Sequence, residues 1–256
     1  MTRKTNIPST SRDIYFSQVG KSEASGFSPE VPVSSPAEAL AVVGTLLPVP
    51  DGSNPASINA AITGSYTDNL TLVDNTTAQC RFASLLNFVP FSTSITAAST
   101  QESVWGAILL LSDNSVGYDI NGQVRHAAIL NALVLNNAGT TGFNVTGSCD
   151  DIFVSVVQVE QRGLGSTLVD HTATSTSPIN YHFELIETFA DNTTLIKYNP
   201  VAGSKQTIIE MTTAQKGSGP ATTGCSLFEV EGGILVVDAE VLECDMISQI
   251  FITINR

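Results

Sequence analysis

Apolar and polar side chains alternate along most of the chain after residue 65, which is the pattern of half-buried β-strands. Clusters of Gly, Asn, Asp and Ser, which favour turns, separate these stretches. The predicted strands cover residues 66–73, 78–86, 104–111, 116–120, 152–160, 167–172, 181–188, 194–198 and 208–213. Residues 125–135 fit either a short helix or a buried strand, and the flanking turn residues favour the strand.

The segment 225–255 continues this pattern and carries six carboxylates between Glu229 and Asp245. A turn at Gly232-Gly233 is predicted to separate two strands, and a final strand closes the chain. Asp238 and Glu240 share one strand face with Ile234 and Val236, opposite an apolar face. The residues expected to be buried here are Leu235, Val237, Ala239, Val241, Ile250, Ile252 and Ile254.

Turn signals suggest antiparallel pairing. Asn121-Gly122 is the strongest hairpin signal, because a type I′ turn needs positive φ at both central positions. A second turn is predicted at residues 190–192, and strand 152–160 is apolar on both faces, as a central strand covered on two sides would be. With many short strands and no evident internal repeat, the sequence predicts an all-β fold: a β-sandwich, with a jelly roll preferred. The pattern leaves open whether the body is one sandwich or two.

The first 60 residues differ from the rest, because they hold seven of the eleven prolines. Proline favours extended backbone, so residues 1–60 are predicted to form an extended Pro/Ser-rich arm and residues 61–256 the β-sandwich body. One short helix is expected near residues 36–44. Ser35 suits its N-cap, Pro36 its first position, Glu38 a capping box and Gly44 its end.

The net charge of −13 limits the choice of partners. An acidic body repels phosphate backbones, so nucleic-acid binding is expected only weakly, through Arg3, Lys4 and Arg12. No apolar run is long enough to span a bilayer, and the start of the chain lacks the apolar region of a signal peptide. We therefore expect a protein without a membrane span that is made in a cytoplasm.

Residues that could carry catalysis are few. His126, His171 and His182 are the only histidines, and Asp170 cannot orient His171, because neighbours on a strand point to opposite faces. Asp238 and Glu240 would lie about 7 Å apart on one strand face, as a glycosidase pair could, although exposed carboxylates on an edge strand also discourage aggregation.

Calcium could bind at Asp150-Asp151 or within 113–119, but a turn with side-chain caps explains these residues as well. The cysteines at 80, 149, 225 and 244 lack metal-site spacing. They are read as buried free thiols, with a Cys225–Cys244 bridge as the alternative. We predict no catalytic, cofactor-binding or metal-binding residue, and no enzymatic activity.

An all-β body, an extended arm and the absence of an export signal together suggest a protein that works through contacts. The sequence-based hypothesis is a structural protein of the virion of a virus or phage, such as a jelly-roll capsid or capsid-decorating subunit. It would bind copies of itself and other shell proteins through the N-terminal arm. The alternative is a fibre or adhesin head that binds a glycan or receptor, and a metal-dependent β-sandwich enzyme is a third.

Overall fold

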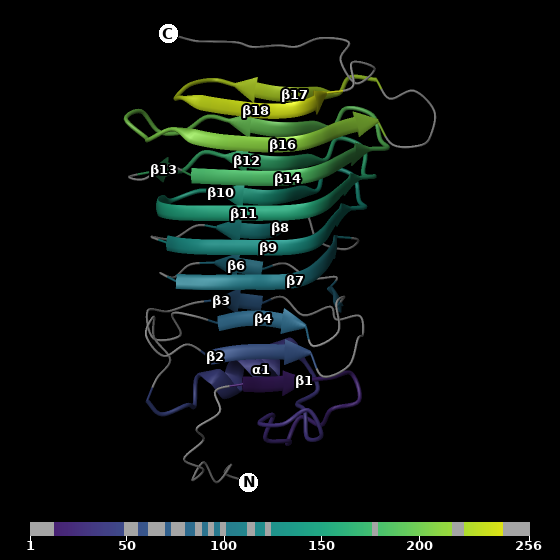
Figure 1. Ribbon diagram of the computed structural model, residues 1–256, viewed down its shortest axis with the longest axis vertical. Helices are drawn as coiled ribbons and strands as arrows, with labels where there is room; N and C mark the ends of the chain where they lie inside the picture. The colour runs from purple at the N-terminus through teal and green to yellow at the C-terminus, as the bar shows by residue number, and fades with distance from the viewer. Residues whose placement is uncertain are drawn as a thin grey trace.

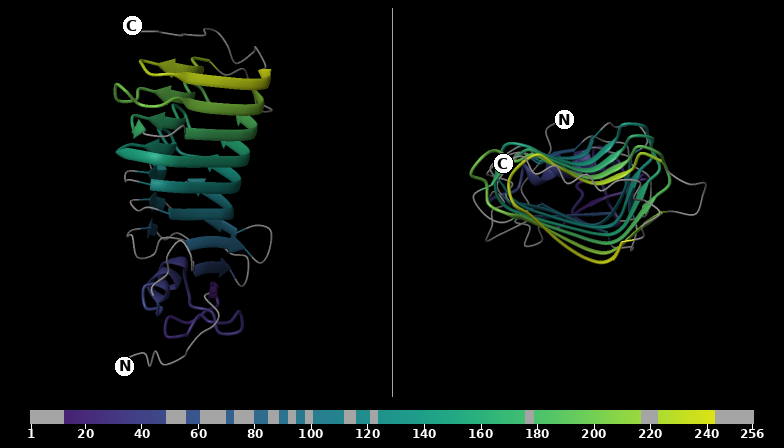
Figure 2. Two further views of the ribbon diagram at one scale, coloured as in Figure 1. Left: turned by 60° about the vertical axis from the view of Figure 1, so that its left-hand side comes forward. Right: turned by 90° about the horizontal axis from the view of Figure 1, so that it is seen from above.

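The computed structural model shows an elongated β-solenoid, in which the chain winds around one long axis (Figure 1). The structure describes residues 13–48, 56–60, 70–72, 80–84, 89–91, 95–97, 101–111, 116–120, 124–175, 179–216 and 223–242. Their strands form an 11-stranded sheet and a 7-stranded sheet, called here the large sheet and the small sheet. Seen along the axis, the two sheets enclose a flattened core (Figure 2).

The large sheet has the strand order β1-β2-β4-β7-β9-β11-β14-β16-β18. These strands are β1 (Asp13–Phe16), β2 (Ala56–Ala60), β4 (Cys80–Ser84), β7 (Gln101–Leu111), β9 (Val124–Leu135), β11 (Ser148–Gln161), β14 (Ile179–Thr188), β16 (Thr207–Lys216) and β18 (Leu235–Leu242). Two short strands complete it, β5 (Val89–Phe91) beside β7 and β13 (Thr174–Ser175) beside β11.

The small sheet runs in the order β17-β15-β12-β10-β8-β6-β3. Its strands are β17 (Ser226–Val230), β15 (Thr194–Tyr198), β12 (Thr167–His171), β10 (Thr141–Val145), β8 (Val116–Ile120), β6 (Ile95–Ala97) and β3 (Leu70–Leu72). From β8 onward the chain alternates between the two sheets, apart from the two-residue β13, so that each turn of the solenoid adds one long strand to the large sheet and one short strand to the small sheet. The all-β class is thus confirmed.

The predicted antiparallel sandwich and its jelly-roll topology are wrong, because the strand pairs of both sheets that the structure describes are parallel. Residues 121–122, the expected hairpin turn, lie outside the described residues, but β8 and β9 on either side belong to different sheets. The Gly232-Gly233 turn likewise joins β17 of the small sheet to β18 of the large one. Several strand positions are confirmed: residues 116–120 and 194–198 are strands, and the ambiguous 125–135 is β9. Strands β1, β2 and β10 were not predicted.

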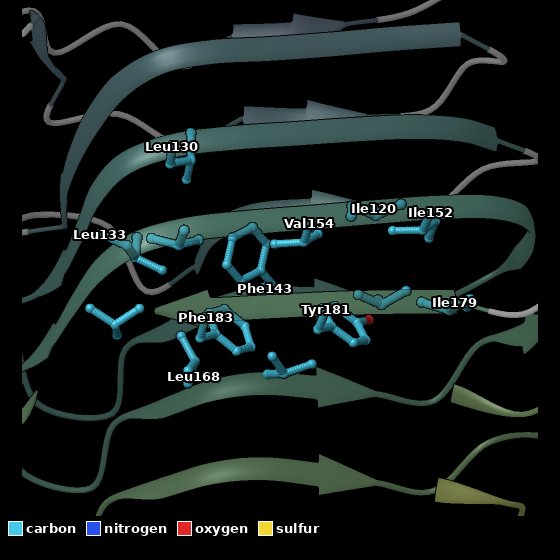
Figure 3. Close-up of a cluster of buried hydrophobic side chains, with 14 of the residues drawn as sticks. Ile120, Leu130, Leu133, Phe143, Ile152, Val154, Leu168, Ile179, Tyr181 and Phe183 are labelled. Carbon is cyan, nitrogen blue, oxygen red and sulfur yellow. The ribbon is translucent and has the colours of Figure 1, made fainter. Parts of the chain in front are cut away.

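The core between the sheets is built from alternating side chains with one change of phase. In β14, Ile179, Tyr181 and Phe183 are buried, the next two residues both point away from the core, and Ile186 is buried again. The same change follows Val156 in β11. The long strands bend where the phase changes, so the large sheet curves around a core in which Phe143 of the small sheet lies beside Val154 and Phe183 (Figure 3).

The corners that lead into the small sheet repeat from turn to turn. Each corner has one residue with a positive φ, in the left-handed region of backbone conformation. These residues are Gly139, Gly165, Asn192 and Gly224 in successive corners. A small buried residue follows in each case, namely Thr140, Ser166, Thr193 and Cys225. Backbone bonds link successive corners: Gly139 N donates to Leu164 O at 2.8 Å, and Gly165 N to Asp191 O at 3.0 Å. Stacked corners therefore hold the turns in register.

The N-terminal segment covers the first strands of the solenoid. Helix α1 (Pro36–Val43) starts as predicted, with the Ser35 hydroxyl accepting from the Glu38 N–H at 3.2 Å. It contacts β1 and β2 and buries Ala39, Val42 and Val43. The extended arm is therefore a wrong prediction for residues 13–48, because their apolar side chains join the core. Residues 1–12 lie outside the described part, and a domain boundary at residue 60 stays a prediction.

The last described strand is less covered than expected. Val237 is 38% exposed, although Tyr181 and Ile209 at the same register position are buried. Leu235 and Ala239 are half-buried against the core. The predicted burial of Val237 is wrong because β18 ends the described sheet and has a neighbouring strand on one side only. The side chain of Val241 and residues 250, 252 and 254 lie outside the described part.

Candidate interaction face

The two histidines whose side chains the structure describes, His171 and His182, do not form a site together. His171 points into the core from β12, whereas His182 lies on the outer side of β14, with its Nδ1 3.4 Å from Glu210 Oε2. His126 is on β9, where its side chain is not described. Asp170 faces outward beside Asn144, as the strand argument predicted, and so it does not orient His171.

His171 is instead a core residue, and its side chain is fully buried. Its Nδ1 lies 3.0 Å from Tyr181 Oη, and the Tyr198 ring is 5.2 Å away between centroids. The other ring nitrogen, Nε2, has no hydrogen-bond partner among the described residues. Desolvation in this apolar surrounding lowers the pKa of His171 to about 4, so the ring is neutral at pH 7.

A second buried polar group is Gln161, at the end of β11. Its Nε2 donates to the carbonyl oxygens of Thr194 at 3.1 Å and Ser166 at 3.4 Å, and its Oε1 accepts from Thr188 Oγ1 at 3.3 Å. The side chain therefore connects the two sheets where water cannot replace it.

We expect Gln161→Leu to lower the free energy of unfolding by about 1–3 kcal/mol, because the Thr188 hydroxyl loses its acceptor in a buried site. Urea unfolding followed by circular dichroism measures this loss. Gln206→Leu is the control, since Gln206 is exposed and should change stability by less than about 0.5 kcal/mol. Equal effects of the two variants would contradict a structural role for the buried amide.

The carboxylates singled out in the sequence are spread over the surface. Asp238 and Glu240 are exposed on β18, and Asp238 is in register with Glu210. Asp119, at the end of the proposed calcium segment 113–119, accepts from Asn144 Nδ2 at 2.8 Å. The side chains of Asp150 and Asp151 are not described. Within the described ranges no three His, Cys, Asp or Glu residues are grouped as metal ligands would be.

Cys225 is a free, buried thiol that accepts a hydrogen bond from Thr193 Oγ1 at 3.3 Å. This agrees with the reading of Cys225 as a packed residue. Cys244 lies outside the described residues, and the side chains of Cys80 and Cys149 are not described.

The outer side of the small sheet carries a row of mixed charge. On the small sheet, one outward register position carries Asp119, Asn144, Asp170, Lys197 and Glu229 on successive strands. These side chains are half-buried or exposed, while the residues before and after Asn144, Asp170 and Lys197 on their strands are buried. A row of mixed charge is well solvated, and nothing in it calls for a further partner.

Two register positions of the large sheet carry no ionisable residue on six neighbouring strands, although the row between them contains His182, Glu210 and Asp238. The first position holds Ser103, Ala127, Phe153, Asn180, Ile208 and Val236. The second holds Ile108, Ala132, Gln158, Leu185, Thr213 and Val241. We call the side of the large sheet that bears these two rows the outer face.

Large apolar side chains reach solvent on the outer face. Phe153 is 41% exposed, Val157 44% and Val236 41%. The prediction that strand 152–160 is covered on both sides is therefore wrong for this chain alone: Ile152 and Val154 are buried inside, but the other side of β11 is open. The apolar pattern of β11 and the exposure of its outer side agree if another molecule covers this side.

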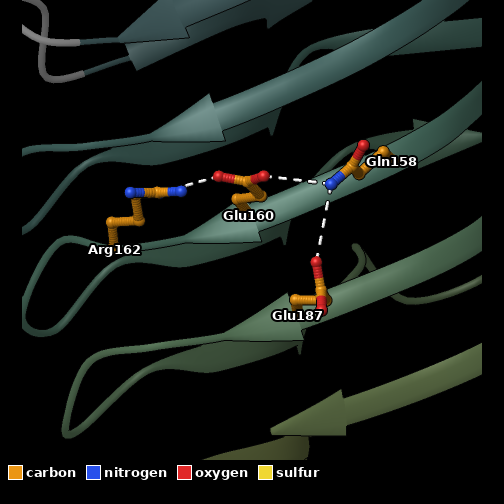
Figure 4. Close-up of polar contacts among 4 residues, drawn as sticks. All are labelled: Gln158, Glu160, Arg162 and Glu187. Atoms are coloured by element: carbon orange, nitrogen blue, oxygen red, sulfur yellow. Dashed lines mark hydrogen bonds and ion pairs between the residues drawn. The ribbon is translucent and has the colours of Figure 1, made fainter. Parts of the chain in front are cut away.

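Polar side chains border the outer face where the strands approach the corners (Figure 4). Gln158 Nε2 donates to Glu160 Oε1 at 3.0 Å and to Glu187 Oε2 at 3.5 Å, and Arg162 Nε donates to Glu160 Oε2 at 2.7 Å. The Arg162 guanidinium also lies 5.0 Å from the centre of the Phe189 ring. Because each acid has a partner, this border is ordered and polar, as the rim of an interface is.

No known family model, curated protein or solved structure matches this chain. Among the described residues, no helix has the length and apolar character needed to cross a membrane. Function is therefore inferred from the geometry of the solenoid and of its faces. Sequence reasoning missed the outer face, because the apolar residues that form it were assigned to a sandwich interior.

Proposed function

We propose that the protein is a rod-shaped structural subunit that acts through contacts with other subunits. One observation carries this proposal: a long parallel β-solenoid exposes the apolar side chains of Phe153, Val157 and Val236 on the outer side of its large sheet. Solenoids offer extended surfaces, and exposed apolar side chains on a sheet suit association better than catalysis. A jelly-roll capsid role is withdrawn with the jelly roll, and a viral or phage particle as the setting stays a prediction.

The elongated shape favours a fibre-like part over a tile of a closed shell. A rod can place contacts along its length, and stacked turns transmit load through backbone hydrogen bonds between parallel strands. The glycan- or receptor-binding alternative fits the same shape and stays a prediction. A test of self-association distinguishes the structural subunit from the glycan- or receptor-binding protein.

We expect the purified protein to self-associate reversibly and to behave as an elongated particle. Sedimentation velocity across a concentration series from about 1 to 200 μM should show a rising weight-average mass. Protein interfaces of standard size typically give micromolar or tighter affinity, which this concentration range covers. Small-angle scattering should give the distance distribution of a rod. A monomer at every concentration would overturn the proposed function.

A further inference from the structure

We propose that residues 250–254 form the next strand of the small sheet, parallel to β17 and in register with its residues Ser226–Val230. Among the described residues, β17 lies at the end of the solenoid and pairs with β15 alone (Figure 1). A strand with one neighbour presents a row of backbone N–H and C=O groups to a further strand. The partner of this edge is a segment of the same chain, whatever other subunits the solenoid contacts.

Two core side chains of β17 are less buried than their equivalents in the preceding turns. Phe228 and Val230 are only partly buried where they pack against the core. The residues at the same two register positions of the three preceding strands are at most 1% exposed, namely Phe143, Val169 and Ile196, and Val145, His171 and Tyr198. Within the described part of the chain, Phe228 and Val230 therefore lack the cover that the following turn gives to each earlier strand.

Two regular series of backbone hydrogen bonds join successive strands of the small sheet. At the strand starts, the bonds are Thr167 N to Thr140 O at 2.8 Å, Thr194 N to Ser166 O at 2.9 Å and Ser226 N to Thr193 O at 2.8 Å. Just after the strand ends, they are Thr172 N to Val145 O, Asn199 N to His171 O and Glu231 N to Tyr198 O, each at 2.9 Å. The next acceptors in the two series are Cys225 O and Val230 O. In the proposed register, the backbone N–H groups of Ile250 and Asn255 are their donors.

The sequence Ile-Phe-Ile-Thr-Ile of residues 250–254 fits the positions of a small-sheet strand. In β10, β12, β15 and β17 the second position is Gly or Leu, the third is apolar, the fourth is Asn or charged, and the fifth belongs to the core. Phe251 and Ile252 suit the second and third positions, Thr253 the outward fourth and Ile254 the fifth. Ser248, where the other corners have Gly or Asn, and Ile250, where the other strands begin with Thr or Ser, depart from the pattern.

The connection that precedes residue 250 has a suitable length. Small-sheet strands begin six residues after the ends of β9, β11 and β14 and ten residues after the end of β16. Residue 250 follows the end of β18 by eight residues, within this range. A segment tethered at this distance has a high effective concentration at the edge of β17, whereas a second copy loses its translational freedom on binding. The tether therefore favours the chain's own segment as the occupant.

The first strand of the large sheet shows how this chain covers an edge by itself. Beyond β1, which ends that sheet, Tyr15 N donates to Gly26 O at 2.7 Å and Ser17 N to Val33 O at 2.9 Å. Val33 N in turn donates to Tyr15 O at 3.0 Å. The edge of β1 is thus bonded to a following segment of the same chain, as we propose for β17.

A pair of introduced cysteines in the full chain tests the proposed register. Glu229→Cys and Thr253→Cys place thiols on paired outward positions with Cα atoms about 4.8 Å apart, which a disulfide can bridge. Glu229 is exposed, so its replacement leaves the core intact. The matched control combines Glu229→Cys with Phe251→Cys, which puts the second thiol on the other face and the Cα atoms roughly 8 Å apart. After mild oxidation, peptide mapping by mass spectrometry should find the bridge at least about 5-fold more often in the first pair.

A second measurement does not depend on disulfide chemistry. Ile252→Asn should lower the melting temperature by at least about 4 °C, because it puts an amide in the core, whereas Thr253→Asn should lower it by less than about 1 °C. A bridge within one chain that is confined to the first cysteine pair, together with this difference in melting temperature, supports the proposal. A bridge between two copies, seen as a dimer on non-reducing gels, would assign the edge to a neighbouring subunit and overturn it. Equal bridging in the two pairs, or equal losses in the two asparagine variants, would also overturn it.

Discussion

Replacing Gly163 with alanine should destabilise the protein by about 3 kcal/mol or more, the upper end of the cost of forcing atoms into a packed site. Gly163 lies in the corner after β11, where its N–H donates to Leu135 O at 2.8 Å. A Cβ atom there would overlap the backbone carbonyl of Asn137 in the corner of the preceding turn. Neither backbone can retreat without breaking the hydrogen bonds between stacked corners.

Gly165→Ala is the control for this prediction, because the two glycines lie in the same corner. Gly165 has φ of +67° and open space around its Cα, so alanine there meets backbone strain alone, about 1 kcal/mol. Thermal and urea unfolding of both variants measure the difference. Equal losses at the two positions would mean that the close approach of Gly163 to Asn137 does not constrain the fold.

Acid should destabilise the protein through His171 by roughly 3 kcal/mol. The pKa of the buried ring is about 4 in the folded state against 6.5 when exposed, and each unit of difference corresponds to about 1.36 kcal/mol. Because the folded pKa is the lower one, the unfolded chain binds the proton first. Stability is therefore complete above about pH 6.5 and is lost as the pH falls towards 4.

His171→Phe removes this proton while keeping a ring beside Tyr198, so the variant should lose less stability than the wild type between pH 7 and 4. Comparing the two chains cancels the titration of the many carboxylates, which both share. His182→Gln is the control, since His182 lies on the outer side of β14 and is partly exposed. Urea midpoints at several pH values test the prediction, which parallel curves for wild type and His171→Phe would contradict.

The sequence contains a repeat that was not predicted. Short strands of the small sheet read Thr-Gly-Phe-Asn-Val, Thr-Leu-Val-Asp-His, Thr-Leu-Ile-Lys-Tyr and Ser-Leu-Phe-Glu-Val from residues 141, 167, 194 and 226. A glycine or asparagine stands two residues before each, namely Gly139, Gly165, Asn192 and Gly224. Spacings of 26, 27 and 32 residues are those of a solenoid turn. The unequal spacing and the loose residue identities hid the period.

The outer face was out of reach of the sequence for a different reason. An apolar residue such as Phe153 follows the same rule of alternation whether its partner belongs to the same chain or to another copy. Only the course of the chain shows that no described segment crosses β11 on that side. The contact of His171 could not be predicted from the sequence either. Its position on a strand was predicted, but its contact with Tyr181 depends on how the two sheets face each other.

The sequence by itself determined where the long strands of the large sheet lie, that the fold is all-β, and where α1 begins, because side-chain alternation and helix capping are local properties. Only the tertiary structure decided which strands pair. An alternating strand presents the same hydrogen-bonding groups to a parallel or an antiparallel neighbour, and the choice depends on the corners between them. At Gly139, Gly165 and Asn192 the chain turns into the other sheet instead of folding back, which makes a solenoid of strands that would also suit a sandwich.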